Sequence, residues 1–138
     1  MFYEHIFRAL NSSGLNYAVI GGIAVVLHGY NRTTSDLDML IALTDDEIKK
    51  FVQVCENIGL VPRLPVNIQD LADSEKRKEW IEEKNMLVFS VYNPENPVEH
   101  IDLMIHNSDR FDQILSNKIV FKDGDLEVPI ASIDDLIM

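Results

Sequence analysis

Residues 16–38 read NYAVIGGIAVVLHGYNRTTSDLD. They contain a short apolar run, two glycines, a second apolar run of helical length and the start of a further strand. Because Gly21 and Gly22 follow the first apolar run directly, we place them at a strand-to-helix junction. Glycines at such a junction let backbone N–H groups and a helix N-terminus approach phosphate oxygens closely. The stretch therefore predicts a site for a phosphate-bearing ligand.

The triplet Asp36-Leu37-Asp38 lies on the strand that we expect over residues 36–42. Since side chains alternate along a strand, Asp36 and Asp38 share one face, while Leu37 and Met39 point into packing. Two carboxylates a few ångströms apart repel each other, and a hard divalent cation is the usual compensation. The triplet therefore predicts a site for Mg²⁺ or Mn²⁺.

A third acidic residue, Asp102, stands within the otherwise apolar segment HIDLMI at residues 100–105. An isolated buried carboxylate is costly, so this residue needs a partner or a function. If its strand lies beside residues 36–42, three acids converge. Such a group suffices to hold one or two magnesium ions and to polarise an incoming hydroxyl.

The composition is typical of one soluble domain. The chain has 138 residues, of which 46% are hydrophobic, and no apolar run approaches the length that spans a bilayer. Because the N-terminus also lacks a signal-peptide pattern, we expect a cytoplasmic protein with no membrane partner. The net charge of −11 disfavours non-specific binding of nucleic acid. The single cysteine, Cys55, is expected to be a buried apolar residue.

Hydrophobic periodicity and turn residues predict alternating helices and strands. We expect an α/β (α+β) domain over residues 1–138, with a mixed, largely antiparallel β-sheet flanked by helices. The expected helices are at about 2–12, 21–27, 45–58, 68–83 and 109–116, and the expected strands at 16–20, 36–42, 60–64, 86–92, 98–105, 118–121 and 126–128. Ser132 and Asp135 begin one more helix.

Taken together, these residues resemble the nucleotidyltransferase superfamily that includes DNA polymerase beta. Its signature is an apolar residue, Gly, then Gly or Ser, a spacer, and Asp-x-Asp. Here the spacer between Gly22 and Asp36 is residues 23–35. Residues 62–66, 70–73 and 128–132 add a resemblance to small prokaryotic proteins grouped with abortive-infection nucleotidyltransferase toxins. Patterns for Walker-type, dinucleotide, zinc and serine-hydrolase sites are absent from the sequence.

The resemblance implies a metal-dependent transfer of a nucleoside monophosphate from a nucleoside triphosphate to a hydroxyl, with release of pyrophosphate. Asp36 and Asp38 would bind Mg²⁺ or Mn²⁺, and Asp102 would complete the metal site and help to deprotonate the acceptor. The terminal phosphates would be held by Gly21, Gly22, Arg32, Thr34 and Ser35.

The resemblance leaves the acceptor open among transfer RNA, a protein and a small molecule, and it implies a possible antitoxin partner. Chains of this family usually continue into a basic segment after the last helix. We therefore expect the C-terminal continuation, and with it part of the acceptor site, to be missing or supplied in trans.

Other interpretations of the same residues stay open. The fold could serve as a noncatalytic nucleotide-binding or protein-interaction module, or as a plain metal-binding domain. Arg32 could form a structural ion pair with a neighbouring aspartate. His28 and His100 are typical of hydrogen-bonded packing residues. The basic cluster at 76–78 is typical of a solvated helix face, and guidance of an anionic acceptor is the alternative.

Overall fold

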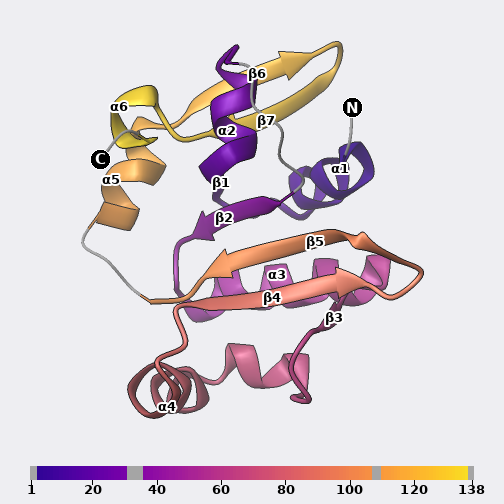
Figure 1. Ribbon diagram of the computed structural model, residues 1–138, viewed down its shortest axis with the longest axis vertical. Helices are drawn as coiled ribbons and strands as arrows, with labels where there is room; N and C mark the ends of the chain where they lie inside the picture. The colour runs from indigo at the N-terminus through magenta and orange to yellow at the C-terminus, as the bar shows by residue number, and fades with distance from the viewer. Residues whose placement is uncertain (1–2, 31–35, 107–109, 137–138) are drawn as a thin grey trace.

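The computed structural model describes residues 3–30, 36–106 and 110–136. Within these ranges the chain forms one seven-stranded sheet in the order β3-β4-β5-β2-β1-β7-β6 (Figure 1). The strands are β1 (Tyr17–Ile20), β2 (Leu37–Ile41), β3 (Val61–Pro62), β4 (Val88–Asn93), β5 (Asn96–Met104), β6 (Ile119–Asp123) and β7 (Leu126–Ile130).

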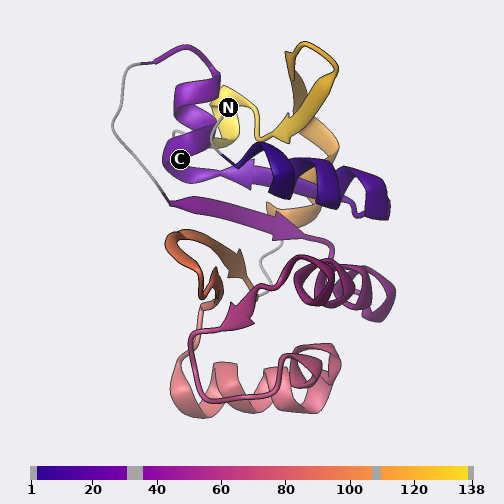
Figure 2. The ribbon, with the colours of Figure 1, turned by 90° about the vertical axis from the view of Figure 1, so that its right-hand side faces the viewer.

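The helices are α1 (Glu4–Ser13), α2 (Gly21–Leu27), α3 (Asp45–Ile58), the 3₁₀ helix η1 (Ile68–Ala72), α4 (Ser74–Lys84), α5 (Arg110–Asn117) and α6 (Ile133–Leu136). Neighbouring strands are antiparallel at β1–β2, β3–β4, β4–β5 and β6–β7, and parallel at β2–β5 and β1–β7. The prediction of a mixed, largely antiparallel sheet flanked by helices is therefore confirmed. Helix α4 and the β6–β7 hairpin lie at opposite ends of the long axis (Figures 1 and 2).

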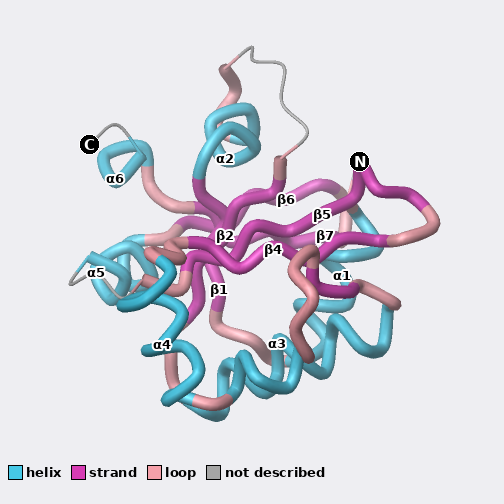
Figure 3. The backbone as a smooth tube through the Cα atoms, turned by 60° about the horizontal axis from the view of Figure 1, so that its bottom comes forward, coloured by secondary structure: helices cyan, strands magenta, loops and turns pink. Residues whose placement is uncertain are grey.

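The two faces of the sheet differ in how they are covered. Figure 3 shows α3 on one side of the sheet and α2 and α6 on the other. On the side of α1 and α3, alternate strand residues such as Val19, Met39 and Leu103 join the large apolar core. On the opposite side, Ala18 and Leu40 join a smaller cluster with α5. The smaller cluster leaves room on that face for polar residues.

Helix α3 has the ends that the sequence predicts. The Thr44 side chain accepts a hydrogen bond from the Glu47 amide at 3.3 Å, and Gly59 ends the helix with φ of 79°. Glycine adopts that left-handed conformation without the penalty of a Cβ atom. Phe51 and Cys55 on its inner face are fully buried, which confirms that the cysteine is an apolar core residue.

The prediction of a single helix over 68–83 is wrong, because Asp73 separates the 3₁₀ helix η1 from α4. Its Oδ1 accepts from the amides of Glu75 (2.9 Å) and Lys76 (3.4 Å), so Asp73 acts as the N-cap of α4. Aspartate favours a cap over a helix interior, since its short side chain satisfies free amides. The Arg77 guanidinium donates to the Leu71 carbonyl at 2.7 Å across this break.

The strands after α4 follow the predicted pattern with shifted ends. The connection between the strands expected at 86–92 and 98–105 is shorter than those bounds imply, because Asn93 already pairs with Asn96. The Asn93 side chain accepts from the Glu95 amide at 3.0 Å, a local bond that tightens the turn. Trp80 of α4 stacks on Phe89 of β4 with ring centroids 5.5 Å apart, which fastens the helix to the sheet. No helix within the described ranges is long and apolar enough to cross a membrane.

Candidate functional site

Polar residues from adjacent strands form one row across the middle of the sheet. Asp38 of β2 lies opposite Ile20 of β1 and opposite Asp102 of β5, and Asp102 lies opposite Ser90 of β4. Directly paired residues point to the same face, so these side chains share the face that is opposite the large core. The strand pairing therefore brings together two acids that are far apart in the sequence.

Asp38 is the most perturbed carboxyl group in this row. Partial burial, followed by the facing charges of Asp102 and Asp36, raises the pKa of Asp38 from 3.8 to about 6. Contact with the Asp102 carboxyl acts in the same direction. Among the described residues, no Arg, Lys or hydroxyl group donates a hydrogen bond to Asp38. His100 acts in the opposite direction, but burial and the neighbouring acids outweigh it.

Gly21 makes this arrangement possible from the neighbouring strand end. It begins α2 with φ of 69°, a conformation that side-chain-bearing residues rarely adopt. A Cβ atom at this position would collide with Asp38 Oδ2. Gly22 is buried in the first turn of the same helix. The strand-to-helix junction at the two glycines is thus where the sequence predicts it, and Gly21 leaves the space that the Asp38 carboxylate fills.

Asp102 and Asp36 are held by neighbours that the sequence reasoning did not place at the site. Ser90 Oγ donates to Asp102 Oδ1 at 2.6 Å. His100 Nε2 lies 3.3 Å from Asp36 Oδ1 and 4.0 Å from Asp102 Oδ2. The other ring nitrogen, Nδ1, lies 3.2 Å from the Val98 carbonyl oxygen. If Nδ1 donates its proton to this carbonyl, Nε2 can donate to Asp36 or Asp102 only when the imidazole carries both protons.

Strand alternation was the signal that identifies His100, because it lies two residues before Asp102 and so shares its face. Ser90 gave no comparable signal, since its position depends on the β4–β5 register. His28, by contrast, is a packing residue as expected: its Nε2 lies 2.8 Å from the Ala131 carbonyl oxygen. The predicted phosphate-binding residues Arg32, Thr34 and Ser35 lie outside the described residues.

The chemistry of the row fits a divalent cation without presenting a finished metal site. Within residues 3–30, 36–106 and 110–136, no three His, Cys, Asp or Glu side chains are already arranged to hold a metal ion. Asp38 and Asp102 meet as expected, whereas the exposed Asp36 carboxylate lies against His100. His100 Nε2 faces both Asp36 and Asp102, at 3.3 and 4.0 Å. Carboxylate oxygens suit Mg²⁺ or Mn²⁺, and Gly21 allows the Asp38 carboxylate to lie at the start of α2.

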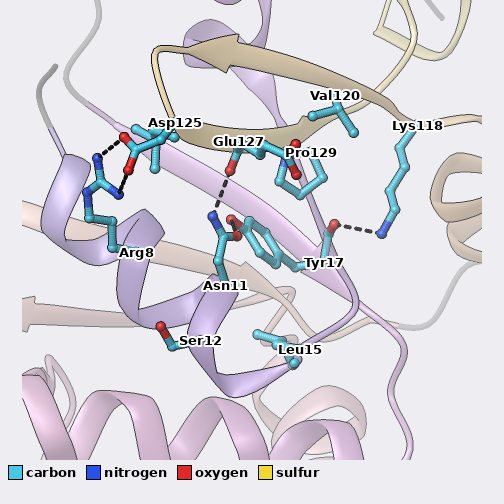
Figure 4. A pocket seen from close by; sticks show the side chains of 12 residues that line it. Arg8, Asn11, Ser12, Leu15, Tyr17, Lys118, Val120, Asp125, Glu127 and Pro129 are labelled. Carbon is cyan, nitrogen blue, oxygen red and sulfur yellow. Dashed lines mark hydrogen bonds and ion pairs between the residues drawn. The ribbon is translucent and has the colours of Figure 1, made fainter.

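A groove of about 630 Å³ lies away from these acids, between α1 and the β6–β7 hairpin (Figure 4). Its charged groups are largely paired with one another or with backbone. Arg8 and Asp125 form an ion pair at 2.9 Å, Asn11 donates to the Glu127 carbonyl at 2.7 Å, and Lys118 donates to the Tyr17 carbonyl at 3.2 Å. The first two bonds fasten α1 to the hairpin, and the third links the residue before β6 to β1. The groove contains none of the predicted site residues.

No known protein family and no curated protein matches the sequence. Among solved structures, the fold is similar to the crystal structure of a "putative nucleotidyltransferase" from Thermotoga maritima. The TM-score is 0.61, the matched region covers 96% of this chain and 76% of that chain, and the sequences are 9% identical. Identity this low establishes likeness of fold alone. The chain therefore has a nucleotidyltransferase-like fold, and its catalytic chemistry has to be argued from the row of acids.

Proposed function

We propose that this chain is a metal-dependent nucleotidyltransferase. The observation that carries the proposal is the pairing of Asp38 with Asp102 on the face away from the large core, with the Asp38 carboxylate close to Gly21. The raised pKa of Asp38 supports it, because perturbed acids concentrate at functional sites. The fold shared with the Thermotoga maritima protein supports the same reaction class.

In the proposed reaction, the oxygen of an acceptor hydroxyl forms a bond to the α-phosphorus of a nucleoside triphosphate. The bond between that phosphorus and the bridging oxygen breaks, pyrophosphate leaves, and the hydroxyl proton passes to a carboxylate or to water. A bound Mg²⁺ or Mn²⁺ would supply charge stabilisation to the attacking and leaving oxygens. Asp38 and Asp102 would hold the ion, with Asp36 completing the set after leaving His100.

The protein side chains orient these acids. Ser90 donates to Oδ1 of Asp102, while Oδ2 lies 4.0 Å from His100 Nε2. His100 holds Asp36 close to the row. Gly21 and Gly22 would face the terminal phosphates, together with Arg32, Thr34 and Ser35, as the family resemblance implies. Orientation of this kind matters because a displaced reacting group loses rate steeply.

The test is transfer of label from each of four nucleoside triphosphates, labelled at the α-phosphate, to components of a cell extract with magnesium present. We expect one labelled product that requires the metal and disappears in the Asp38→Asn variant. Asp46→Asn, on the exposed first turn of α3, is the matched control and keeps full transfer. Transfer that continues in Asp38→Asn would contradict the proposed site.

A second candidate is a noncatalytic nucleotide-binding module of the same fold. It is favoured because, in the described ranges, no three His, Cys, Asp or Glu side chains are arranged to hold a metal ion, and the exposed Asp36 carboxylate lies against His100. Magnesium-dependent triphosphate binding with no labelled product would select this candidate. The abortive-infection toxin class, the antitoxin partner and the cytoplasmic location remain predictions from the sequence.

A further inference from the structure

Tyr3, the residue before α1, has an unusual backbone conformation for a tyrosine. Its φ of 69° lies in the left-handed region, which a residue with a Cβ atom occupies at a cost in free energy. Among the described residues other than glycine, only Asn85 shares this conformation, and it ends α4, where asparagine commonly adopts it. A residue that precedes a helix ordinarily has an extended backbone, and the Tyr3 side chain does not cap α1. The conformation therefore points to a tertiary contact.

That contact is with the backbone of β5. The Tyr3 side chain is buried in the large core, and its hydroxyl lies at the strand. Tyr3 Oη donates to the Val98 carbonyl at 3.3 Å and accepts from the His100 amide at 3.3 Å. Strand β2 begins at Leu37, opposite Ile101, so its pairing with β5 does not extend to these two groups. The Tyr3 hydroxyl thus bonds backbone groups of β5 that lie beyond the start of β2.

The Val98 carbonyl also contacts the ring of His100. The Nδ1 atom of that ring lies 3.2 Å from the same oxygen that accepts from Tyr3. A carbonyl oxygen has two lone pairs and can accept from both donors. Burial raises the pKa of Tyr3 above its usual value of 10.0, so the hydroxyl keeps the proton that it donates. Tyr3 therefore binds the His100 backbone directly and shares the acceptor that orients the His100 ring.

The other side of the His100 ring faces the acids. Its Nε2 lies 3.3 Å from Asp36 Oδ1 and 4.0 Å from Asp102 Oδ2. From these contacts we propose that Tyr3 is a positioning residue for nucleotidyl transfer. Its hydroxyl fixes His100, and His100 in turn keeps Asp36 close to Asp102. The inference rests on the proposed function, and Tyr3 acts through His100.

The proposed role connects the two faces of the sheet. The Tyr3 ring belongs to the large core, whereas His100 shares the opposite face with Asp102 because the two are separated by two positions in one strand. The Tyr3 hydroxyl joins these faces at the β5 backbone. The packing of α1 against the core therefore sets the position of a side chain among the acids. A small displacement of such a group lowers the rate steeply.

The first test is Tyr3→Phe, which keeps the ring in the core and removes only the hydroxyl. We expect kcat for label transfer to fall about fivefold to tenfold, with KM for the triphosphate unchanged. Tyr17→Phe is the matched control, because Tyr17 is also buried and its hydroxyl donates to Asn11 Oδ1 at 2.8 Å. It should keep full transfer. Urea denaturation of both variants checks that the fold is retained.

A double-mutant cycle with His100→Ala shows whether Tyr3 acts through the imidazole. When His100 is already alanine, adding Tyr3→Phe should lower kcat by less than about twofold, because the side chain that the hydroxyl positions is gone. A purely structural tyrosine would lower kcat by the same factor with and without His100. The cycle therefore separates positioning from a general loss of stability.

Nuclear magnetic resonance of the imidazole groups follows the position of His100 without any reaction. The chain has four histidines, and the signals of His100 are assigned by their absence in His100→Ala. Tyr3→Phe should shift or broaden these signals, and Tyr17→Phe should leave them unchanged.

Several outcomes overturn the inference: normal kcat in Tyr3→Phe, an equal loss in Tyr17→Phe, the same factor of loss with and without His100, or His100 signals that Tyr3→Phe does not move. If the unaltered protein transfers no label while Tyr3→Phe still moves the His100 signals, the transferase proposal fails and the contact between Tyr3 and His100 stands. If there is neither transfer nor movement of the signals, both proposals fail.

Discussion

Two carboxylates in this molecule, one buried and one partly buried, differ in the chemical nature of their neighbours. Near the C-terminal helix, Asp135 is 8% exposed and accepts hydrogen bonds from Arg110 (3.4 Å), Gln113 (3.1 Å) and Ser132 (3.1 Å). In the middle of the sheet, Asp38 faces a second acid, Asp102, and burial and the neighbouring acids outweigh the opposing effect of His100 on its pKa.

The difference distinguishes an acid that serves the fold from one that is available for chemistry. Donors surround Asp135 on several sides, so its charge is already compensated and its oxygens are occupied. Asp38 and Asp102 raise each other's energy, which a divalent cation would relieve. Burial alone does not identify a functional carboxylate; the chemical nature of its neighbours does.

The largest effect should come from Asp102→Asn. Loss of the carboxylate should lower nucleotidyl transfer on the order of 10³-fold, because charge stabilisation of the transferred group is the main contribution of such a site. Triphosphate affinity should fall much less. Label transfer at saturating and subsaturating triphosphate measures both. Ser90→Ala, which removes only the hydrogen bond that orients Asp102, should lose about tenfold. An Asp102→Asn variant with normal transfer would remove the residue from the mechanism.

Gly21→Ala should be the next most damaging change. The positive φ and the collision with Asp38 together should lower the free energy of unfolding by about 3 kcal/mol. Gly124 is the matched control, because it has φ of 62° in the β6–β7 turn and an added Cβ atom would meet nothing within 4 Å. Gly124→Ala should therefore cost only about 1 kcal/mol. Urea denaturation compares them, and equal losses would show that the close approach to Asp38 is unimportant.

Asp135→Ala should lower the free energy of unfolding by about 2 kcal/mol, because it removes the buried carboxylate that accepts hydrogen bonds from Gln113 and Ser132. Transfer per folded molecule should stay unchanged at a temperature well below the melting point. Chemical denaturation and label transfer on the same sample check both statements. A loss of transfer with unaltered stability would reverse the roles assigned to the two acidic sites.

The smallest effect concerns pH. The folded protein binds the Asp38 proton more tightly than the unfolded chain does, since its pKa rises from 3.8 to about 6 on folding. The free energy of unfolding should therefore fall as pH rises through this window in the absence of divalent ions, and the penalty is complete above pH 6. With solvent screening, Asp38→Asn should add about 1 kcal/mol of stability at pH 7 and nothing at pH 3.5.

Urea denaturation in EDTA at the two pH values measures this difference. Glu83→Gln removes an exposed charge from α4 and should behave alike at both pH values. Magnesium should stabilise the unaltered protein at pH 7 and leave Asp38→Asn unaffected. Stability that rises between pH 4 and pH 6 because of Asp38 would contradict the assigned pKa.

Local patterns predicted much of the fold. Thr44 and Gly59 mark both ends of α3 because caps satisfy backbone groups within a few residues. The helix over 68–83 was predicted wrongly at Asp73, where two short-range preferences compete and the cap forms. For the candidate site, Asp38, Asp102 and Gly21 were found, whereas the positions of Ser90 and His100 beside them were not.

Residue order alone was enough to put the two glycines at the junction before α2 and Asp38 on the strand that follows, since both follow from patterns between near neighbours. Asp36, which was expected on the same strand, lies just before β2 begins at Leu37. Residue order could not specify that β5 lies next to β2, or that position 102 is level with position 38. That register depends on the packing of apolar residues from the whole sheet against α1 and α3. Only in the folded protein do the two carboxylates meet, and their mutual repulsion, with partial burial, is what prepares this face for a cation.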